Sequence, residues 1–418
     1  MEIKMLPLER FDYQGKNVLL RLDINSPLDP VTKRIVSDNR IKKSVPTVKY
    51  LLEQGAKLSI IAHQGDTLDY QNLIPLAEHA EKLSQLLGVK VAYIDDVCGP
   101  AAQNAVKALQ PGEAVLLGNL RYLAEEVTAF EKDVKLTPPE MLSTWLVRSL
   151  APLHEIYVND AFSAAHRNHP SMVAFQELLP TAGGRIMYDE YAALSRVMSG
   201  PARPSVFFLG GAKISDAFGM MGTVLAKGTA DYILTAGITG MIMLMASGHR
   251  TGERFENFLR DRDLLAFVEP ARKLLTDFPD KIRFPSDVVC EADGVKSVAT
   301  AADLPVEGAL YPDIGPETIK MYTDYLQKAG TIFVNGPAGV YENPDYAEGT
   351  RAIWQAIAEA PGYSVIGGGD TVSAAGRFID LKKISYVCTA GGAMVNFLSG
   401  KKLALIQAME KAYERDRL

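Results

Sequence analysis

Residues 205–213 read Ser205-Val206-Phe207-Phe208-Leu209-Gly210-Gly211-Ala212-Lys213, and the predicted fold is built outward from them. The run 205–209 is short, apolar and rich in aromatic and branched side chains, which is typical of a strand buried on both faces of a parallel sheet. Two glycines end it and let the backbone approach a ligand closely, and residues 215–226 have helical apolar spacing. Since open α/β sheets bind ligands at the carboxyl ends of their strands, Lys213 is predicted to face a ligand. An ordinary turn with a surface lysine is the alternative.

The composition of the 418 residues describes a globular protein of two domains. Hydrophobic residues make up 47% and charged residues 22%, and the length exceeds what one core normally supports. The net charge of −6 argues against a general nucleic-acid binder, because contacts with phosphates need an excess of Lys and Arg. Cys98, Cys290 and Cys388 are widely spaced, which favours buried thiols in a reducing compartment. With no recognisable signal peptide or membrane-spanning run, a cytoplasmic location is expected.

Strand-like and helix-like segments alternate along both halves of the chain. In the first half we predict strands at 18–20, 58–62, 89–93, 114–117 and 156–158, and helices at 40–52 (after the possible cap Asp38), 75–87 and 100–109. In the second half we predict strands at 205–209, 232–235, 331–334 and 363–366, and helices at 215–226, 317–327, 347–359 and 405–415. This alternation predicts the α/β class, with two doubly wound parallel sheets. A helix at 187–198 joins the halves without a low-complexity linker, which favours a hinge over a tether.

The run Gly367-Gly368-Gly369-Asp370-Thr371 follows a predicted strand and opens a helix. A glycine turn at a helix N-terminus offers free N–H groups and a positive dipole end, which suit a phosphate. Asp370 could hold Mg²⁺, which needs few protein ligands when phosphates supply the rest, and Thr371 could cap the helix. A glycine turn with an acidic cap is the structural alternative. The chain lacks G-x-x-x-x-G-K-[ST] and G-x-G-x-x-G, which disfavours a P-loop ATPase or an ordinary Rossmann dehydrogenase.

The run Asn335-Gly336-Pro337-Ala338-Gly339-Val340-Tyr341-Glu342 follows another strand of the same half. Its glycines suit a backbone surface on which a flat ring can pack, and Glu342 can accept hydrogen bonds from ribose hydroxyls. Taken alone, the motif favours a tight loop.

Basic side chains recur beside strand ends in the first half. A lone arginine is usually a solvated surface residue, and a lone histidine is usually structural. Their recurrence at the same end of successive strands would nevertheless build one basic pocket. Such a pocket suits a small ligand with phosphate and carboxylate groups, because arginine forks pair bidentately with both. The residues concerned are Arg21, Asp23, Asn25, Arg40, His63, Arg121, His166 and Arg167.

These motifs, taken in order over about residues 16–400, resemble those of phosphoglycerate kinase. The resemblance rests on Arg21-x-Asp23-x-Asn25-x-Pro27, Asp38-Asn39-Arg40-Ile41, Asn159-Asp160-Ala161-Phe162 with Ala165-His166-Arg167, Gly210-Gly211-Ala212-Lys213, Asn335-Gly336-Pro337 and Gly367-Gly368-Gly369-Asp370. Ala62-His63-Gln64 and Asp216-Ala217 resemble the archaeal branch of the family.

The resemblance implies a fold and a reaction. The fold is two Rossmann-like domains separated by a hinged cleft. The reaction is reversible phosphoryl transfer between 1,3-bisphosphoglycerate and ADP, giving 3-phosphoglycerate and MgATP. A phosphoglycerate-binding domain is expected at 1–186, with 400–418 packing back on it. A nucleotide-binding domain is expected at 187–399, entered through the linker helix 187–199.

The resemblance also implies a role for each site residue. Phosphoglycerate would be held by Arg21, Asp23, Asn25, Arg40, His63, Arg121, His166 and Arg167. The nucleotide would be held by Gly211, Ala212, Lys213, Gly237, Asn335, Gly336, Pro337, Val340, Glu342, Gly367, Gly368, Gly369, Asp370 and Thr371. Arg40 and Lys213 would act on the phosphoryl group in flight, near a loop with Gly391 and Gly392, and Asp370 would hold Mg²⁺. The expected partners are these small molecules, without nucleic acid or membrane, and the chain is expected to be a monomer or a homodimer.

Three residues depart from the family's pattern. Asp66 stands where an arginine of the substrate pocket is usual, Gly118 replaces a glutamate, and Ala390 replaces the first of three glycines. The readings left open are a working phosphoglycerate kinase, a paralogous kinase of another small carboxylate and a non-catalytic nucleotide-binding protein. Asp66 is the main argument for the paralogue, because it places an anion near a phosphate. Keeping both Arg40 and Lys213 argues against the non-catalytic protein. The sequence does not decide between ADP and another diphosphate.

Overall fold

The computed structural model describes residues 3–65 and 70–417, which fold into two compact units. The N-terminal unit comprises the described residues up to Ala192 together with those from Lys402 onward, and the C-terminal unit is Ala193–Lys401. The division falls within helix α7 (Arg185–Ser199), which contains the predicted linker helix 187–198. Each unit is described separately below.

The N-terminal unit is built on a six-stranded sheet of order β3-β4-β2-β1-β5-β6, in which all neighbours are parallel. Leu20, Ile60 and Val158 are fully buried in its core. The strands are β1 (Asn17–Leu22), β2 (Lys57–Ile61), β3 (Val91–Tyr93), β4 (Ala114–Leu116), β5 (Ile156–Asp160) and β6 (Thr181–Gly183). The predicted parallel sheet is therefore confirmed, although β6 was not predicted.

The helices predicted at 40–52, 75–87, 100–109 and 405–415 are confirmed, whereas the three short helices at 128–133, 145–150 and 170–173 were not predicted. The helices of this unit are α1 (Asn39–Glu53), α2 (Ala77–Leu87), α3 (Pro100–Ala108), α4 (Thr128–Asp133), α5 (Trp145–Leu150), α6 (Pro170–Val173) and α16 (Ala404–Asp416). Short 3₁₀ turns include η3 (Leu120–Tyr122), η4 (Ala124–Glu126), η7 (Phe162–Ala164) and η8 (Phe175–Glu177). Asp38 occupies the N-cap position of α1 as predicted, but its side chain makes no capping hydrogen bond and pairs instead with Lys42 at 2.8 Å.

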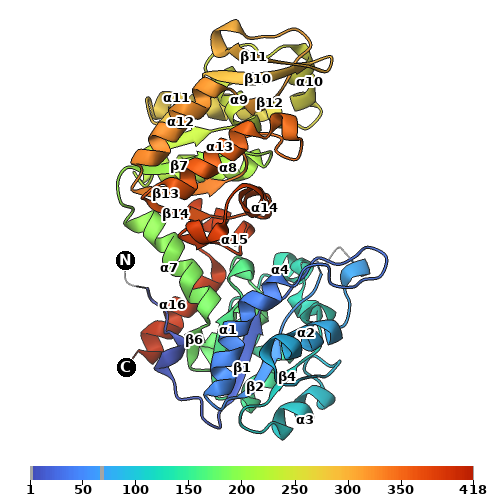
Figure 1. The fold of residues 1–418 in the computed structure, drawn as a ribbon. Helices are drawn as coiled ribbons and strands as arrows, with labels where there is room; N and C mark the ends of the chain where they lie inside the picture. Colours follow the sequence, from blue (N-terminus) through green and yellow to red (C-terminus); the bar gives the residue numbers. More distant parts are fainter. Residues whose placement is uncertain (1–2, 66–69, 418) are drawn as a thin grey trace. The chain divides into compact units, whose positions relative to one another are not determined.

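The end of the chain packs on this unit through α16. Its Leu405 N–H donates to the carbonyl of Ala165 at 3.0 Å, and Lys411 pairs with Glu177 of η8 at 2.6 Å. Thr181 of β6 donates its N–H to the Asp416 carboxylate at 3.1 Å. Residues far apart in sequence are thereby held beside one another at this edge of the sheet (Figure 1).

The C-terminal unit contains a second parallel sheet, of order β15-β14-β13-β7-β8-β9. All five residues of β7, including Phe207 and Phe208, are buried, which confirms that 205–209 is a strand covered on both faces. The strands are β7 (Ser205–Leu209), β8 (Tyr232–Thr235), β9 (Ile282–Arg283), β13 (Thr331–Asn335), β14 (Tyr363–Ile366) and β15 (Tyr386–Val387).

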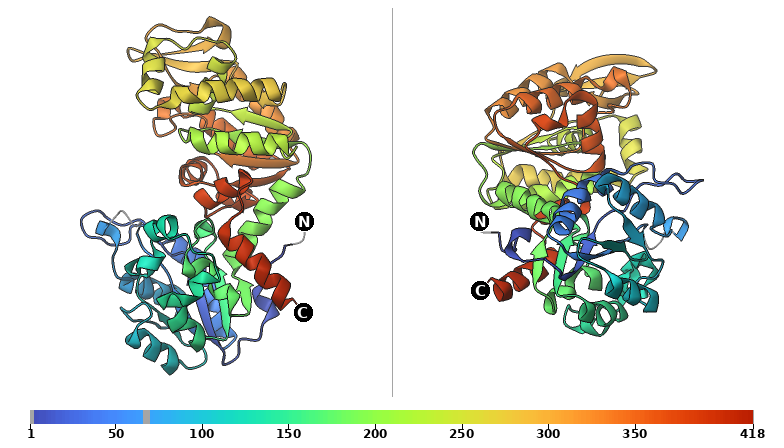
Figure 2. Two further views of the ribbon diagram at one scale, coloured as in Figure 1. Left: turned by 180° about the vertical axis from the view of Figure 1, so that it is seen from behind. Right: turned by 60° about the horizontal axis from the view of Figure 1, so that its bottom comes forward.

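Helices cover both faces of this sheet (Figures 1 and 2), with α12 and α13 on one side and α8 and α11 on the other. Tyr322 and Leu326 of α12 and Trp354 of α13 are buried against β7 and β13 in the core. The helices are α8 (Ile214–Ala226), α9 (Gly237–Ala246), α10 (Glu253–Arg260), α11 (Val268–Asp277), α12 (Pro316–Lys328), α13 (Glu348–Glu359), α14 (Gly369–Phe378) and α15 (Gly392–Leu398).

A three-stranded antiparallel sheet in this unit was not predicted. It consists of β10 (Asp287–Ala292), β11 (Val295–Thr300) and β12 (Leu310–Ile314), with β10 in the centre. β11 is almost wholly exposed, so it lacks the apolar run that identified the other strands. The Asp293-Gly294 dipeptide, whose residues both have positive φ, is a hairpin signal that could have revealed it. Within the described part of the chain, no helix has both the length and the apolar character needed to cross a bilayer.

Candidate functional site

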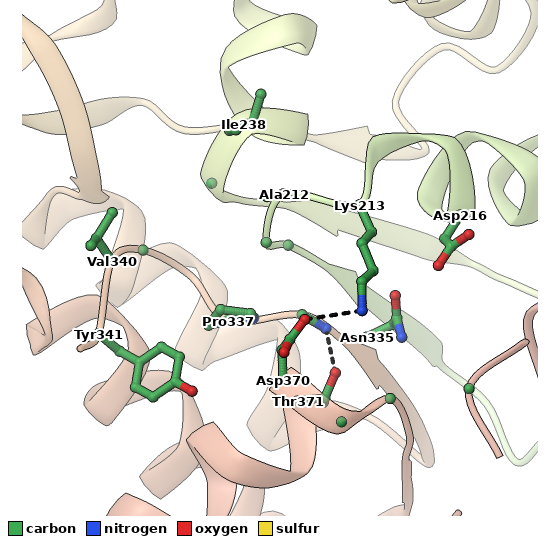
Figure 3. A pocket seen from close by; sticks show the side chains of 18 of the residues that line it. Ala212, Lys213, Asp216, Ile238, Asn335, Pro337, Val340, Tyr341, Asp370 and Thr371 are labelled. Carbon is green, nitrogen blue, oxygen red and sulfur yellow. Dashed lines mark hydrogen bonds and ion pairs between the residues drawn. The ribbon is translucent and has the colours of Figure 1, made fainter. Parts of the chain in front are cut away.

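A cavity of about 360 Å³ opens at the carboxyl ends of the C-terminal unit's parallel strands (Figure 3). Its lining comes from the segments after β7, β8, β13, β14 and β15. In the sheet order the chain runs from β7 outward to β8 and β9 on one side, and β13 to β15 lie on the other. The cavity therefore lies where the strand order reverses, which is the usual ligand site of an open α/β sheet.

Most of the predicted nucleotide residues line this cavity. They are Gly211, Ala212, Lys213, Gly237, Asn335, Gly336, Pro337, Val340, Glu342, Gly368, Gly369, Asp370 and Thr371, together with Gly391 and Gly392. Gly367 does not line the cavity. A Cβ built on it would lie 2.1 Å from the Met394 sulfur, so a glycine is required here for packing. Sequence analysis did not assign Gly210, Asp216, Ile238, Tyr311, Pro312, Gly339, Tyr341 and Val395 to the lining. Tyr311 and Pro312 belong to β12, which had not been predicted.

The glycines after β7 and β13 let two loops meet backbone to backbone. A Cβ on Gly210 would lie 2.1 Å from the Pro337 carbonyl oxygen. A Cβ on Gly336, whose φ is +93°, would lie 2.2 Å from the Gly210 carbonyl oxygen. The Gly211 N–H donates to the Pro337 carbonyl at 2.8 Å. These glycines therefore fix the floor of the cavity, and their small size serves contact between loops as well as access for a ligand.

Two side chains of opposite charge face each other across the cavity in Figure 3. The Lys213 Nζ lies 3.1 Å from the Asp370 Oδ2, and the two side chains are 66% and 68% exposed. Lys213 comes from the turn before α8, and Asp370 lies in the first turn of α14. An ion pair as exposed as this one contributes at most about 1 kcal/mol to folding, so both groups can change partner when a charged ligand arrives.

Thr371 does not have the capping role that was predicted. It lies inside the first turn of α14, and its Oγ1 accepts a hydrogen bond from the Gly336 N–H at 2.8 Å. Asn335 donates from its side chain to the Gly367 carbonyl at 3.0 Å. The two motifs 335–342 and 367–371 are thus joined directly, a connection that their separate positions in the sequence did not reveal.

The acidic residues of the cavity fit a cation that arrives with a phosphate ligand. Among the described residues, no group of three or more His, Cys, Asp or Glu side chains is arranged to hold a metal. The cavity lining supplies the carboxylates of Asp216, Glu342 and Asp370, of which Asp216 lies in the first turn of α8 and Asp370 in the first turn of α14. Mg²⁺ commonly uses one or two protein carboxylates while phosphates and water complete its shell.

In the N-terminal unit, the predicted basic residues lie at the carboxyl ends of β1, β2, β4 and β5, as expected. Arg21 is 2% exposed, and its Nη2 lies 3.0 Å from the His63 Nδ1. The Arg21 guanidinium also donates to the Leu22 carbonyl and, at 3.3 Å, to the Ser171 hydroxyl. Protein groups therefore hold this arginine in place.

Asp23 connects the end of β1 to the start of α1. Its Oδ2 lies 2.8 Å from the Arg40 Nη1 and also accepts a hydrogen bond from the Ser163 hydroxyl. Burial alone would raise the pKa of the Asp23 carboxyl, but Arg40, His63, Ser163 and Arg21 together lower it below its ordinary value. Asp23 is thus an anion that positions Arg40.

Arg121, His166 and Arg167 form a second group in the same unit. The Arg167 Nη1 lies 3.7 Å from the Glu131 carboxylate, and His169 is 3.4 Å from the same carboxylate. Burial raises the pKa of Glu131, but hydrogen bonds from His169 and Asn168 and the charge of Arg167 lower it to about 2. Arg121 donates to the Glu126 carbonyl and lies 3.4 Å from the His169 Nδ1.

A buried glutamate joins the two groups. Ser171 donates its N–H and its hydroxyl to the Glu126 carboxylate, each at 2.6 Å, and that hydroxyl also accepts from Arg21. Sequence analysis missed Glu126, Glu131, Ser163, His169 and Ser171, because they lie in short helices and turns, or beside them, where no periodic spacing marks them.

The histidines of this set contribute little positive charge at neutral pH. Burial, with Arg21 next in importance, lowers the pKa of His63 well below its ordinary value. Burial and the charge of Arg167 lower the pKa of His166. The positive charge at these strand ends therefore resides in the arginines, and the histidines act as neutral hydrogen-bonding groups.

Of the three residues that depart from the family's pattern, the structure describes Gly118 and Ala390. Asp66 lies outside the described residues. A Cβ on Gly118 would lie 3.0–3.1 Å from backbone atoms of Asp96 and Val97, so the glycine lets this loop pack closely. Ala390 is fully buried directly before the turn of Gly391 that leads into α15.

Comparison with known proteins gives a consistent result. The family model described as phosphoglycerate kinase matches residues 8–401. The phosphoglycerate kinase of Methanococcus maripaludis is 41% identical over 417 residues, covering 99% of this chain and 100% of that protein. That of Thermococcus kodakarensis is 40% identical and covers 98% of both chains. The crystal structure of phosphoglycerate kinase from Pyrococcus horikoshii OT3 is 35% identical, with a TM-score of 0.87 over 98% of this chain and 100% of that one.

Proposed function

Because the chain belongs to the phosphoglycerate kinase family, we propose that its two residue sets divide the substrates of that reaction between them. The family's reaction is reversible phosphoryl transfer between 1,3-bisphosphoglycerate and ADP, giving 3-phosphoglycerate and ATP in glycolysis. The chain is therefore a phosphotransferase, and the motif resemblance, including its archaeal character, is confirmed. The comparisons give no support to a paralogous kinase or a non-catalytic protein.

The nucleotide, proposed to be ADP or ATP, binds in the cavity of the C-terminal unit. The observation that carries this proposal is the exposed Lys213–Asp370 pair above a glycine-lined floor. Lys213 is suited to pair with phosphate oxygens. The apolar side chains of Ile238 and Val340 line the same cavity and are suited to pack against a flat base. Glu342 is proposed to accept hydrogen bonds from the ribose hydroxyls.

Mg²⁺ is proposed to bind with the nucleotide, and Asp370 is the carboxylate that would hold it. The bound ion would neutralise phosphate charge. Lys213 can then leave Asp370 and pair with phosphate oxygens, because its ion pair is exposed and weak.

Phosphoglycerate is proposed to bind at the strand ends of the N-terminal unit. Arg21, Arg121 and Arg167 would pair with its carboxylate and phosphate, and the neutral His63 and His166 would donate or accept hydrogen bonds. Asp23 and Asn25, at the end of β1 and in the loop after it, would complete the substrate-binding set. This assignment is supported by the shared network through Ser171 and Glu126, which holds arginines from separate strands in one cluster.

Phosphoryl transfer requires alignment of the groups and neutralisation of charge on the equatorial oxygens. We assign the neutralising cations to Arg40 and Lys213. The same proposal includes a hinge at helix 187–199 and the exclusion of water when the domains close. It also includes the domain limits, which are 1–186 with 400–418 for the first domain and 187–399 for the second.

A cytoplasmic location is also proposed, and the free, buried state of Cys98, Cys290 and Cys388 supports it.

The test is a coupled assay with MgATP and 3-phosphoglycerate on the wild type, Lys213→Ala and the matched surface variant Lys320→Ala. Lys320 is exposed on α12 and does not line the cavity. Turnover of about 1–1000 per second is expected for the wild type and Lys320→Ala, with a fall of at least about 100-fold in Lys213→Ala. Equal turnover in all three proteins would overturn the assignment of Lys213.

A further inference from the structure

Gln64, which follows the predicted substrate residue His63, makes hydrogen bonds to neighbouring strand-end loops through both its side chain and its backbone. It is 2% exposed. Its Oε1 accepts from the Ser26 N–H at 2.8 Å and contacts the His79 Nε2 at 3.0 Å. Its Nε2 donates to the Ser26 carbonyl at 3.0 Å. The side chain therefore pairs with both backbone groups of one residue in the loop after β1.

The backbone of Gln64 makes a matching pair with the loop after β4. Its N–H donates to the Asn119 Oδ1 at 3.1 Å, and its carbonyl accepts from the Asn119 Nδ2 at 3.0 Å. Asn119 is fully buried and also accepts from the Arg121 N–H at 3.1 Å. One glutamine thus connects the loops that follow three neighbouring strands, β1, β2 and β4.

Each of these three loops carries a proposed substrate residue, which lies one or two positions from the loop residue that takes part in the Gln64 hydrogen bonds. Asn25 precedes Ser26, His63 precedes Gln64, and Arg121 lies two residues after Asn119. The Asn25 side chain accepts from the Gly65 N–H at 3.1 Å, which adds a second connection between the first two loops. A change at Gln64 is therefore transmitted to all three loops that carry these groups.

The backbone N–H and carbonyl of Ser26 fix the orientation of the amide, and His79 adds a third contact. His79 is fully buried on α2, and burial lowers its pKa to about 4, so the ring is neutral at pH 7. Because Gln64 Oε1 is an acceptor, the Nε2 of His79 carries the proton in this contact. The Oε1 then has two donors and the Nε2 faces a carbonyl, and the reversed amide would place like groups together at both Ser26 contacts.

We propose that Gln64 is a positioning residue for phosphoglycerate, which sets the spacing of Asn25, His63 and Arg121 without touching the ligand. The proposal rests on the proposed roles of those three residues. It goes beyond them because it makes the affinity for phosphoglycerate depend on the buried Gln64 amide and on His79. Neither residue was a candidate site residue from the sequence.

The test uses Gln64→Glu with the matched control Gln176→Glu. Gln176 is also 2% exposed in the same unit, and its Nε2 donates to the Met172 carbonyl at 2.6 Å. Each substitution replaces a buried donor to a carbonyl with a carboxylate oxygen. We expect Gln64→Glu to raise the KM for 3-phosphoglycerate about tenfold, with the KM for MgATP unchanged within about twofold. Gln176→Glu is expected to lose stability with both KM values unchanged.

If Gln64→Glu does not fold, His79→Leu removes one donor to Oε1 and leaves the Ser26 pair intact. An increase of about threefold in the KM for 3-phosphoglycerate alone is expected for it. Unchanged KM values in the folded variant, or proportional changes for both substrates, would overturn the positioning role. Wild-type protein without turnover of 3-phosphoglycerate would instead overturn the proposed function itself, so the two failures are distinguishable.

Discussion

The two candidate binding regions differ in how far the protein itself satisfies their charged groups. In the N-terminal unit Arg21 and Arg121 are 2% and 8% exposed and already bonded to protein groups. In the C-terminal unit Lys213 and Asp370 are 66% and 68% exposed and pair only weakly. The first region is organised before its ligand arrives. The second keeps its charges available and has a rigid backbone beneath them. A kinase that binds a small anion and exchanges a nucleotide can use both arrangements.

The largest expected effect concerns the rigid floor of the nucleotide cavity. Gly336→Ala would place a Cβ 2.2 Å from the Gly210 carbonyl oxygen at a φ of +93°. A loss of about 3 kcal/mol or more in the free energy of unfolding is expected from urea denaturation. Gly369→Ala is the control, because no atom lies within 4 Å of its Cβ position. An equal loss in both variants would contradict the close loop contact.

A smaller effect is expected from removing the buried anion of the N-terminal unit. Glu126 is 1% exposed and accepts two hydrogen bonds from Ser171. Glu126→Gln keeps the shape but loses an acceptor and a charge, so a loss of about 2 kcal/mol and a higher KM for 3-phosphoglycerate are expected. Glu155→Gln, in an exposed pair with Lys16, should lose less than about 1 kcal/mol. A smaller loss for Glu126→Gln than for Glu155→Gln would argue against an organised cluster.

A pH dependence of stability is also expected, and each unit contributes one buried carboxyl to it. Burial raises the pKa of Asp160, at the end of β5, and of Asp313, in β12, to about 7 in each case. The folded state then retains protons that the unfolded chain releases near pH 4. The stability that these two carboxyls contribute is therefore fully present below that pH and is lost as the pH rises to about 7.

Separate variants distinguish the two carboxyls. Asp313→Asn and Asp160→Asn should each flatten the decline in unfolding free energy between pH 4 and 7, measured by urea denaturation at several pH values. A slope unchanged in both variants would show that neither carboxyl holds its proton in the folded state.

Sequence reasoning succeeded where local pattern and chemistry coincide. The buried run 205–209 and the glycines after it predicted β7 and part of the cavity lining. It failed where function depends on long-range contacts between polar groups. Thr371 bonds to Gly336 and Glu126 connects two arginine groups through Ser171, and neither contact leaves a periodic signal. The exposed β11 was missed because its pairing depends on a hairpin dipeptide rather than on apolar residues.

The most direct test of the contrast is the free energy of unfolding of Arg21→Ala and Lys213→Ala, measured in urea without ligands. The account predicts a loss of about 2–4 kcal/mol for Arg21→Ala, because it leaves buried partners unsatisfied. It predicts less than about 1 kcal/mol for Lys213→Ala, whose ion pair is exposed. Equal losses in the two variants would contradict the claim that one region is organised in advance and the other is left open for its ligand.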